Sequence, residues 1–359
     1  MTTLKRLMSV NSVVSRNISS KMAGGKYMKA EIVPKKGKNL LNDPIYNKGL
    51  AFSEAERDRL DIRGIVPPAR LLIDEQKGII MEEYWEGLAA RAAQDPSDEI
   101  MKSGVKPDDI RKWQVLQYLQ DRNETLFYSI LMENFQEMAP IIYTPTVAWA
   151  CKNFSHLYRR PRGMYFSAND RGEMASMVYN WPSDDVDAVV VTDGSRVLGL
   201  GDLGIGGLGI SIGKLDLYVA AGGFHPRRIL PAVIDTGTNN PDLLKDPAYL
   251  GLKQARMDGE EYYELIDEFM AAVKLRWPKA LIQFEDFQSK HAINLLERYR
   301  EEYLMFNDDI QGTAATVLAG VYGALKVQGL PAEDLRKKRI IVAGAGSAAS
   351  GVCSKLRMD

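Results

Sequence analysis

The fold class is indicated most clearly by residues 186–213, which have the sequence VDAVVVTDGSRVLGLGDLGIGGLGISIG. This stretch begins with an apolar run, 186–192, rich in β-branched side chains, which is typical of a buried strand. A glycine-rich segment, 199–213, follows the run, and residues 214–221 after it have the pattern of a helix. A buried strand that leads through glycines into a helix favours an α/β fold with a parallel sheet.

Strand and helix patterns keep alternating after this stretch. We expect strands at 228–235 (RILPAVID), 280–284 (ALIQF) and 339–342 (RIIV). We expect helices at 260–275, 289–302 and 311–326. The alternation predicts that the second half of the chain builds one parallel sheet covered by helices.

The first third of the chain has a different, mostly helical pattern. Ser53 and Glu56 form the capping-box pattern that starts a helix. Amphipathic helices are predicted at 71–93 and 108–138, with a proline-containing loop between them. We therefore expect a helical N-terminal region before the α/β part.

The composition excludes several classes of function. The 359 residues include 46 Lys and Arg against 47 Asp and Glu, so no general basic field exists for binding nucleic acid. Two cysteines exclude a disulfide scaffold or a cysteine-rich zinc module, and the three histidines show no paired spacing for metal ligation. No uncharged apolar run reaches the ~18–20 residues needed to cross a bilayer. We expect neither a nucleic acid nor a membrane as partner.

The N-terminus has the composition of a targeting segment. Residues 1–30 contain no Asp or Glu, but they carry five serines and six basic residues. A basic, serine-rich and acid-free amphipathic N-terminus is typical of a mitochondrial transit peptide. A disordered basic tail is the alternative interpretation.

Two pairs of acidic residues stand in apolar surroundings. Glu285 and Asp286 end the predicted strand at 280–284, and Asp308 and Asp309 lie between Phe and Ile residues before a helix. Burying carboxylates is costly unless a cation compensates their charge, and an all-oxygen ligand set suits Mg²⁺ or Mn²⁺. The alternative is that Asp308 or Asp309 only caps the following helix.

Three further residues are candidates for binding or proton transfer. Lys214 is the only charged residue between Asp202 and Asp216, and a lysine in apolar surroundings has a depressed pKa and can act as a base. A surface lysine with a partly covered stem is the alternative. Arg196 follows a strand and can bind a carboxylate through its planar guanidinium. Tyr143 taken singly is interpreted as a core tyrosine.

A dinucleotide-binding fingerprint lies near residue 359. Gly344 and Gly346 belong to a GxGxxA pattern that directly follows the predicted strand at 339–342 and opens a helix expected from Ala348. The glycines allow a tight turn and close approach to a pyrophosphate at the helix N-terminus. A glycine-rich turn of any α/β protein is the alternative. The acid that contacts the ribose is expected ~20 residues further on, so we expect an incomplete coenzyme domain.

Eight motifs in order resemble those of the malic enzymes, which oxidatively decarboxylate malate to pyruvate with NAD or NADP. They are YTPTV (143–147), RRPRGMYF (159–166), NWP (180–182), VVVTDGSRVLGLGDLG (189–204), IGKLDLY (212–218), DTGTNN (235–240), LIQFEDF (281–287) and FNDDIQGTA (306–314). The resemblance extends from about Asn42 to the last residue. It implies an α/β fold with a helical N-terminal region, an α/β catalytic domain and the start of a Rossmann-like NAD(P)-binding domain. The transit peptide corresponds to residues 1–30 and the helical N-terminal region to 31–119. The catalytic domain corresponds to 120–305 and the incomplete NAD(P)-binding domain to 306–359.

The resemblance also implies a role for each candidate residue. Tyr143 matches the general acid, Lys214 the general base, and Asp308 the acid that sets the protonation of the lysine. Arg196 matches the residue that binds a malate carboxylate. The implied metal ligands are Glu285, Asp286 and Asp309, and the implied coenzyme-binding positions are Asp309, Gly344, Gly346, Ser347 and Ala348.

Cofactors, assembly and location follow from the same resemblance. It implies Mg²⁺ or Mn²⁺ together with NAD, with NADP as the alternative coenzyme. It implies a homo-oligomer, either a dimer or a tetramer, or a hetero-oligomer with a full-length homologue, in the mitochondrial matrix or alternatively the cytoplasm. Family members continue well past Asp359. An alternative is therefore a catalytically inactive chain that acts as an interaction or regulatory subunit.

Overall fold

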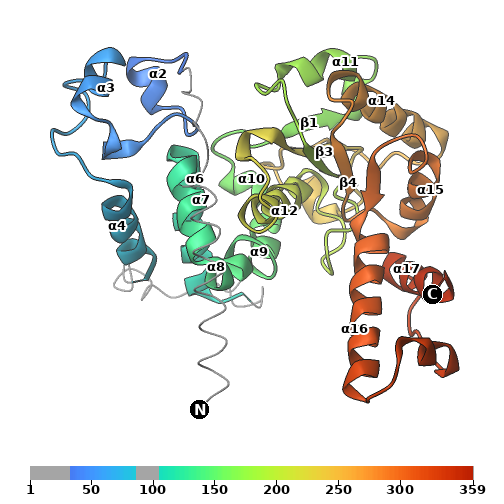
Figure 1. Cartoon of the computed structure of the whole chain (residues 1–359). Helices are drawn as coiled ribbons and strands as arrows, with labels where there is room; N and C mark the ends of the chain where they lie inside the picture. Colours follow the sequence, from blue (N-terminus) through green and yellow to red (C-terminus); the bar gives the residue numbers. More distant parts are fainter. Residues whose placement is uncertain (1–32, 86–104, 359) are drawn as a thin grey trace. The chain divides into compact units, whose positions relative to one another are not determined.

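A computed structural model describes residues 33–85 and 105–358 of the chain (Figure 1). The chain divides into two compact units. One comprises Met1–Arg91 with Gln114–Gln136, and the other comprises Ala92–Trp113 with Glu137–Asp359. The expected transit peptide, 1–30, lies outside the described residues. Within the described ranges, no helix is both long enough and apolar enough to span a bilayer.

The first unit is helical, as predicted. Its helices are α2 (Gly37–Leu41), η1 (Gly49–Ala51), α3 (Glu54–Arg59), α4 (Ile73–Trp85), the second part of α6 (Pro107–Arg122) and α7 (Glu124–Glu133). The capping box is confirmed, because the Ser53 backbone N–H donates to Glu56 Oε2 (2.8 Å) and Ser53 Oγ accepts from the Glu56 N–H (3.4 Å). The part of the predicted helix 71–93 beyond Trp85 lies outside the described residues.

The single helix predicted at 108–138 is wrong. The chain forms three helices there, α6, α7 and α8 (Phe135–Ile142). The first break occurs at Asn123, whose side chain accepts a hydrogen bond from the Leu126 N–H (3.1 Å) and so caps the start of α7. A continuous apolar pattern across 108–138 does not reveal such a break, because the pattern continues on both sides of it.

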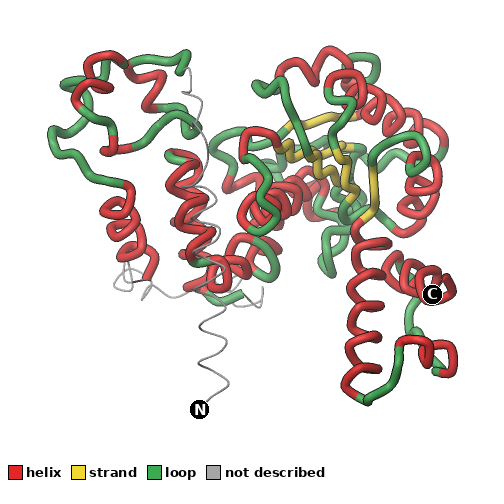
Figure 2. Tube along the Cα trace, viewed as in Figure 1, coloured by secondary structure: helices red, strands yellow, loops and turns green. Residues whose placement is uncertain are grey.

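The second unit is built on a five-stranded sheet in which every neighbouring pair is parallel (Figure 2). Its strands are β1 (Met164–Ser167), β2 (Ala188–Thr192), β3 (Ile229–Asp235), β4 (Leu281–Phe284) and β5 (Met305–Asn307), in the spatial order β1-β3-β2-β4-β5. The predicted strands at 186–192, 228–235 and 280–284 are confirmed as β2, β3 and β4. The short strands β1 and β5 were not predicted.

Helices cover both faces of this sheet. The helices of this unit include α9 (Thr146–Lys152), α10 (Phe154–Leu157), α11 (Met174–Met177), α12 (Leu208–Ala220), α13 (Pro241–Lys245), α14 (Glu260–Arg276), α15 (Ser289–Tyr299), α16 (Thr313–Val327) and α17 (Ser347–Met358), of which α16 and α17 lie beyond the sheet (Figure 1). On one face α14 and α15 pack onto the strands, for example through Phe166 and Phe269, whose rings meet edge to face at 5.0 Å. On the other face α12 buries Leu208 against Val233.

Two predicted elements are corrected near the glycine-rich segments. Helix α12 starts at Leu208, six residues before the expected start at 214, because its small residues fit closely against α9. The strand predicted at 339–342 is wrong. In the described part of the chain no strand pairs with these residues, and Ile341 is 93% exposed. An isolated segment without ladder partners for its N–H and C=O groups does not form a strand.

Candidate active site

The predicted site residues follow the carboxyl ends of three neighbouring strands. Arg196 lies in the loop after β2, Glu285 and Asp286 directly follow β4, and Asp308 and Asp309 directly follow β5. Because the strands are parallel, their carboxyl ends meet at one edge of the sheet, where ligands of open α/β proteins bind. The topology therefore gathers residues that are far apart in the sequence.

Lys214 joins two of these carboxylates. Helix α12 places its Nζ 2.9 Å from Glu285 Oε1 and 2.9 Å from Asp308 Oδ2. The same ammonium lies 4.9 Å from the ring centre of Tyr143, which follows the end of α8. The Tyr143 hydroxyl donates a hydrogen bond to Glu285 Oε1 (3.0 Å). The predicted acid, base and two carboxylates thus lie in direct contact.

The two carboxylates that directly follow β4 are deeply buried, and negative charge accumulates there. Glu285 is 3% exposed and Asp286 is 5% exposed, and the Asp286 N–H donates to Asp309 Oδ2 (2.7 Å). Burial raises the pKa of Glu285 to about 7; the ammonium of Lys214 opposes this rise, and the charge of Asp309 adds to it. Burial, with Asp309 and Glu285 nearby, raises the pKa of Asp286 to about 8. One lysine does not compensate this group of acids.

The expected depressed pKa of Lys214 is wrong. Burial alone lowers the pKa of Lys214, but the carboxylate of Glu285, then Tyr143 and Asp308, outweigh burial and raise it. The sequence pattern showed the apolar neighbours along α12 but not the acids brought in from β4 and β5. Burial and the neighbouring Glu285 also raise the pKa of the Tyr143 hydroxyl, so this tyrosine keeps its proton at neutral pH.

Arg196 and the glycine fingerprint meet at a residue that sequence reasoning missed, Ser289. Arg196 Nη1 donates to Ser289 Oγ (3.4 Å), and the Ser347 N–H donates to the same oxygen (3.2 Å). A Cβ added at Gly346 would lie 3.8 Å from Ser289 Oγ and 4.0 Å from Arg196 Nη2. The pattern at 344–349 therefore lies beside Arg196, and α17 starts one residue before the expected Ala348.

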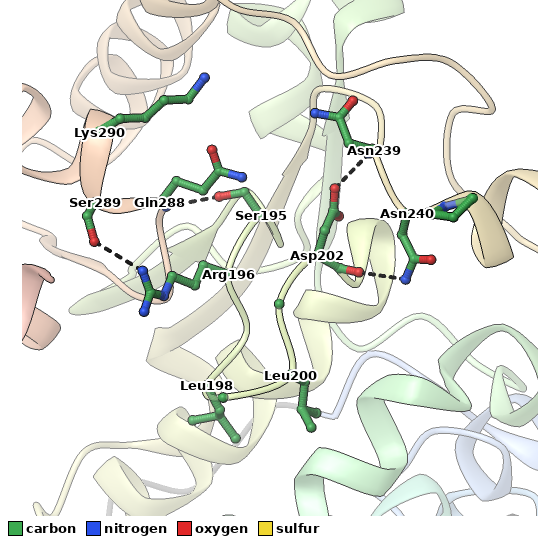
Figure 3. Close-up of a pocket in the computed structure, with 13 residues that line it drawn as sticks. Ser195, Arg196, Leu198, Leu200, Asp202, Asn239, Asn240, Gln288, Ser289 and Lys290 are labelled. Atoms are coloured by element: carbon green, nitrogen blue, oxygen red, sulfur yellow. Dashed lines mark hydrogen bonds between the residues drawn. The ribbon is translucent and has the colours of Figure 1, made fainter.

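Arg196 and Ser289 border an open pocket of ≈ 750 Å³ (Figure 3), whose lining does not include Lys214, Tyr143 or Glu285. Its lining includes Arg196, Asp202, Asn239, Ser289 and Lys290. Figure 3 shows Arg196 and Ser289 pointing toward each other, while Asp202 and the asparagines stand on the opposite side of the pocket. The pocket presents cations and hydrogen-bond donors, which suits an anionic ligand.

A buried ion pair fixes the loop that carries Arg196. Asp202 accepts two hydrogen bonds from the Arg256 guanidinium, at 2.8 and 2.6 Å, and one from the Asn239 N–H at 2.7 Å. Arg256 Nη1 also donates to the backbone oxygen of Asp193 (2.9 Å). Both ends of the loop are thus held by one guanidinium, which restricts the positions open to Arg196.

The residues present match the chemistry of a divalent-cation site, although their side chains are not yet arranged around a single point. Glu285, Asp286 and Asp309 supply only oxygen donors, and Asp286 Oδ2 is buried without a hydrogen-bond partner. Hard oxygen ligands around uncompensated negative charge suit Mg²⁺ or Mn²⁺. Across residues 33–85 and 105–358, however, no three Asp, Glu, His or Cys side chains already converge on one point. Coordination therefore requires side-chain adjustment around these carboxylates.

Comparison with known proteins covers most of the chain. The family model described as "Malic enzyme, N-terminal domain" matches residues 120–300, and "Malic enzyme, NAD binding domain" matches residues 310–359. The mitochondrial NAD-dependent malic enzyme of Solanum tuberosum is 56% identical over 99% of this chain and 56% of its own length. NAD-dependent malic enzyme 1, mitochondrial, of Arabidopsis thaliana is 55% identical over 91% of this chain and 51% of its own. A mitochondrial NADP-dependent malic enzyme of Mus musculus is 45% identical over 90% of this chain and 50% of its own length. This chain spans about half the length of these relatives.

Proposed function

The chain belongs to the malic enzyme family, and we propose that its site serves the oxidative decarboxylation of malate to pyruvate and CO₂ with reduction of NAD(P). The observation that carries the proposal is the contact of Lys214 and Tyr143 with one buried carboxylate, Glu285. The reaction needs a base for the hydroxyl of malate and a separate acid for the enol left after loss of CO₂. Lys214 and Tyr143 are suitable for these two roles.

Glu285, Asp286 and Asp309 are the proposed ligands of the divalent cation. A bound Mg²⁺ or Mn²⁺ supplies a Lewis acid that polarises the keto group and stabilises developing negative charge on oxygen. The raised pKa values of Glu285 and Asp286 support this assignment, because they reflect charge that lacks a partner in the protein.

Lys214 is the proposed base for the malate hydroxyl. Its ammonium is held by Glu285 and Asp308 together. When Glu285 is engaged as a ligand, Lys214 loses the largest contribution that raises its pKa, and the amine can accept a proton. Asp308 stays beside Nζ and can receive that proton in turn.

Tyr143 is the proposed acid for the enol carbon. Its hydroxyl is protonated at neutral pH, as an ordinary phenol is, and burial and Glu285 raise its pKa further. Its ring lies under Nζ of Lys214, so a substrate that contacts the lysine also lies near the phenol. The neighbouring ammonium can stabilise the phenolate that remains after proton transfer.

Substrate and coenzyme are proposed to meet at Ser289, which lines the pocket and accepts a hydrogen bond from the Ser347 N–H. Arg196 supplies a planar guanidinium for a malate carboxylate. Gly344, Gly346, Ser347 and Ala348 provide the tight turn and the helix N-terminus for a pyrophosphate. We propose NAD as the coenzyme and the mitochondrion as the location, because the Solanum tuberosum and Arabidopsis thaliana relatives carry both in their names.

A partial reaction tests the site without hydride transfer. Protonation of the enol, run backwards, removes a proton from the methyl group of pyruvate, so the chain should catalyse deuterium uptake into pyruvate in D₂O. We expect NMR to detect uptake that requires Mn²⁺ and is lost in the Lys214→Met variant. Uptake that is absent, or that ignores Mn²⁺, contradicts the proposed centre. Malate-dependent reduction of NAD, followed at the absorbance band of reduced nicotinamide, tests the whole reaction.

A further inference from the structure

A second polar contact lies beside the proposed acid–base pair. Tyr218 on α12 donates its hydroxyl hydrogen to Gln283 Oε1 on β4. Gln283 Nε2 in turn donates to Glu285 Oε2 at 2.5 Å. Gln283 is 1% exposed, although it stands in the middle of an apolar strand. Neither Gln283 nor Tyr218 was identified from the sequence.

The regular spacing of helix and strand explains why these groups meet. Lys214 and Tyr218 are four residues apart on α12 and lie on one face, about 6 Å apart along the helix axis. Gln283 and Glu285 are two residues apart, so both point to the same face of the sheet about 6.6 Å apart. The two spacings match, so Lys214 faces Glu285 and Tyr218 faces Gln283. The cluster therefore contains two pairs that link α12 to the end of β4: the charged pair Lys214–Glu285 and the neutral pair Tyr218–Gln283.

The hydrogen bonds of the neutral pair determine how the Gln283 side-chain amide is oriented. Gln283 can point either its oxygen or its NH₂ group at Glu285, and only the NH₂ group attracts a carboxylate. The Glu285 carboxylate therefore selects the orientation in which the NH₂ group faces it, and Tyr218 stabilises that orientation by donating to the amide oxygen. Glu285 Oε2 is then occupied, while Oε1 faces Tyr143 and Lys214.

We propose that Gln283 is a positioning residue that holds the Glu285 carboxylate for cation binding, and that Tyr218 stabilises Gln283 in the orientation that this requires. This inference rests on the proposed role of Glu285 as a cation ligand. A carboxylate fixed at one oxygen loses less rotational freedom when the other oxygen binds a cation. Partners of metal ligands usually affect metal affinity by roughly 10- to 100-fold when they are removed.

The test is Mn²⁺ binding to the 359-residue chain, followed by electron paramagnetic resonance of free and bound Mn²⁺. Gln283→Met keeps the length of the side chain and removes the amide, and we expect it to weaken Mn²⁺ binding at least about tenfold. Tyr218→Phe removes one hydroxyl, and we expect a smaller loss in the same direction. Ile282→Val is the control, because it weakens packing on the opposite face of the same strand without touching the amide.

A double-mutant cycle separates positioning from general damage to the fold. If Gln283 acts through Glu285, Gln283→Met causes little further loss of Mn²⁺ affinity in a Glu285→Gln background. Full additivity of the two losses, or unchanged affinity in Gln283→Met, overturns the inference while the cation site stands. Should Gln283→Met fail to fold, the same double-mutant cycle is run with Tyr218→Phe. Its loss of Mn²⁺ affinity should then largely disappear in the Glu285→Gln background. Failure of the unmodified chain to bind Mn²⁺ overturns the proposed cation site, and the inference falls with it.

Discussion

Lys214 Nζ lies 2.9 Å from Glu285 Oε1, so a helix residue and a strand-end residue 71 positions apart form a buried ion pair. The pair exists because α12 packs across β2 and β3 with its polar face toward the carboxyl end of β4. It leaves Asp286 and Asp309 without a cation of their own. Most consequences of the structure follow from this imbalance of charge.

The first prediction concerns stability and pH in the absence of divalent cations. The pKa of Glu285 lies at about 7 in the folded chain, above the ordinary 4.5. Between these two pH values the folded state therefore binds more protons than the unfolded state. Stability is therefore greatest below about pH 4 to 5 as far as this group is concerned, and it falls as the pH rises toward 7. The expected loss is on the order of 3 kcal/mol, measured by urea unfolding.

Added Mn²⁺ should remove most of this loss, because it binds the ionised carboxylates. Glu285→Gln is the comparison and should remove only its own share of the loss, because the pKa values of Asp286 and Asp309 are raised as well and keep stability falling as the pH rises. The comparison is needed because burial lowers the pKa of His291, which makes stability rise with pH between its folded and unfolded pKa values. A pH dependence that is the same with and without Mn²⁺ contradicts the charge imbalance.

The second prediction concerns the contact between α17 and the segment that carries Asp308 and Asp309. A Cβ added at Gly351 would lie 2.1 Å from the backbone oxygen of Ile310, so Gly351→Ala must push α17 away. We expect a loss of about 1–3 kcal/mol in the free energy of unfolding. Gly320→Ala on α16 meets no atom within 4 Å and should stabilise the chain by up to about 1 kcal/mol. Thermal melts of the two variants should move in opposite directions.

The third prediction concerns Arg196. Loss of its charged hydrogen bonds in Arg196→Gln should weaken malate binding about tenfold or more in the presence of Mn²⁺, by isothermal titration calorimetry. Lys290→Gln is the matched control, since Lys290 lines the same pocket and is engaged with Asp258 (2.6 Å). Equal losses in both variants would mean that the pocket attracts malate only through its overall positive charge.

The fourth prediction concerns Tyr143. Tyr143→Phe removes the hydroxyl and keeps the ring, so deuterium uptake into pyruvate should fall at least about 100-fold. Mn²⁺ binding should change much less, because Glu285 retains its contacts with Lys214 and Gln283. Retained uptake in this variant would assign the acid to another group.

The central strands were predictable because each is an apolar run bounded by polar or turn residues. β2 is buried at every position, so its run AVVVT indicates a strand of a parallel sheet without further information. β5 has only three residues, and β1 alternates buried and half-buried positions over four residues, so neither gives the continuous apolar run that revealed β4. They are strands because β3 and β4 supply their hydrogen-bond partners.

The residues of the site were predictable individually, but their interactions were not. Glu285 and Asp286 were identified because acids at the end of an apolar strand are unusual. The pKa of Lys214 could not be predicted, since it depends on Glu285 and Asp308, which only the fold brings near. Gln283 gave one weak signal, a polar residue inside an apolar strand, and its partner Tyr218 gave none. Their contact becomes visible only when α12 is placed against β4.

The most direct test of the account is a crystal structure of the chain grown with Mn²⁺, with anomalous diffraction used to locate the ion. We predict one strong anomalous peak at the carboxyl ends of β4 and β5, contacted by oxygens of Glu285, Asp286 and Asp309, with Lys214 and Tyr143 beside it. An anomalous peak only at another position would contradict this prediction. So would a structure at saturating Mn²⁺ in which no ion contacts the three carboxylates.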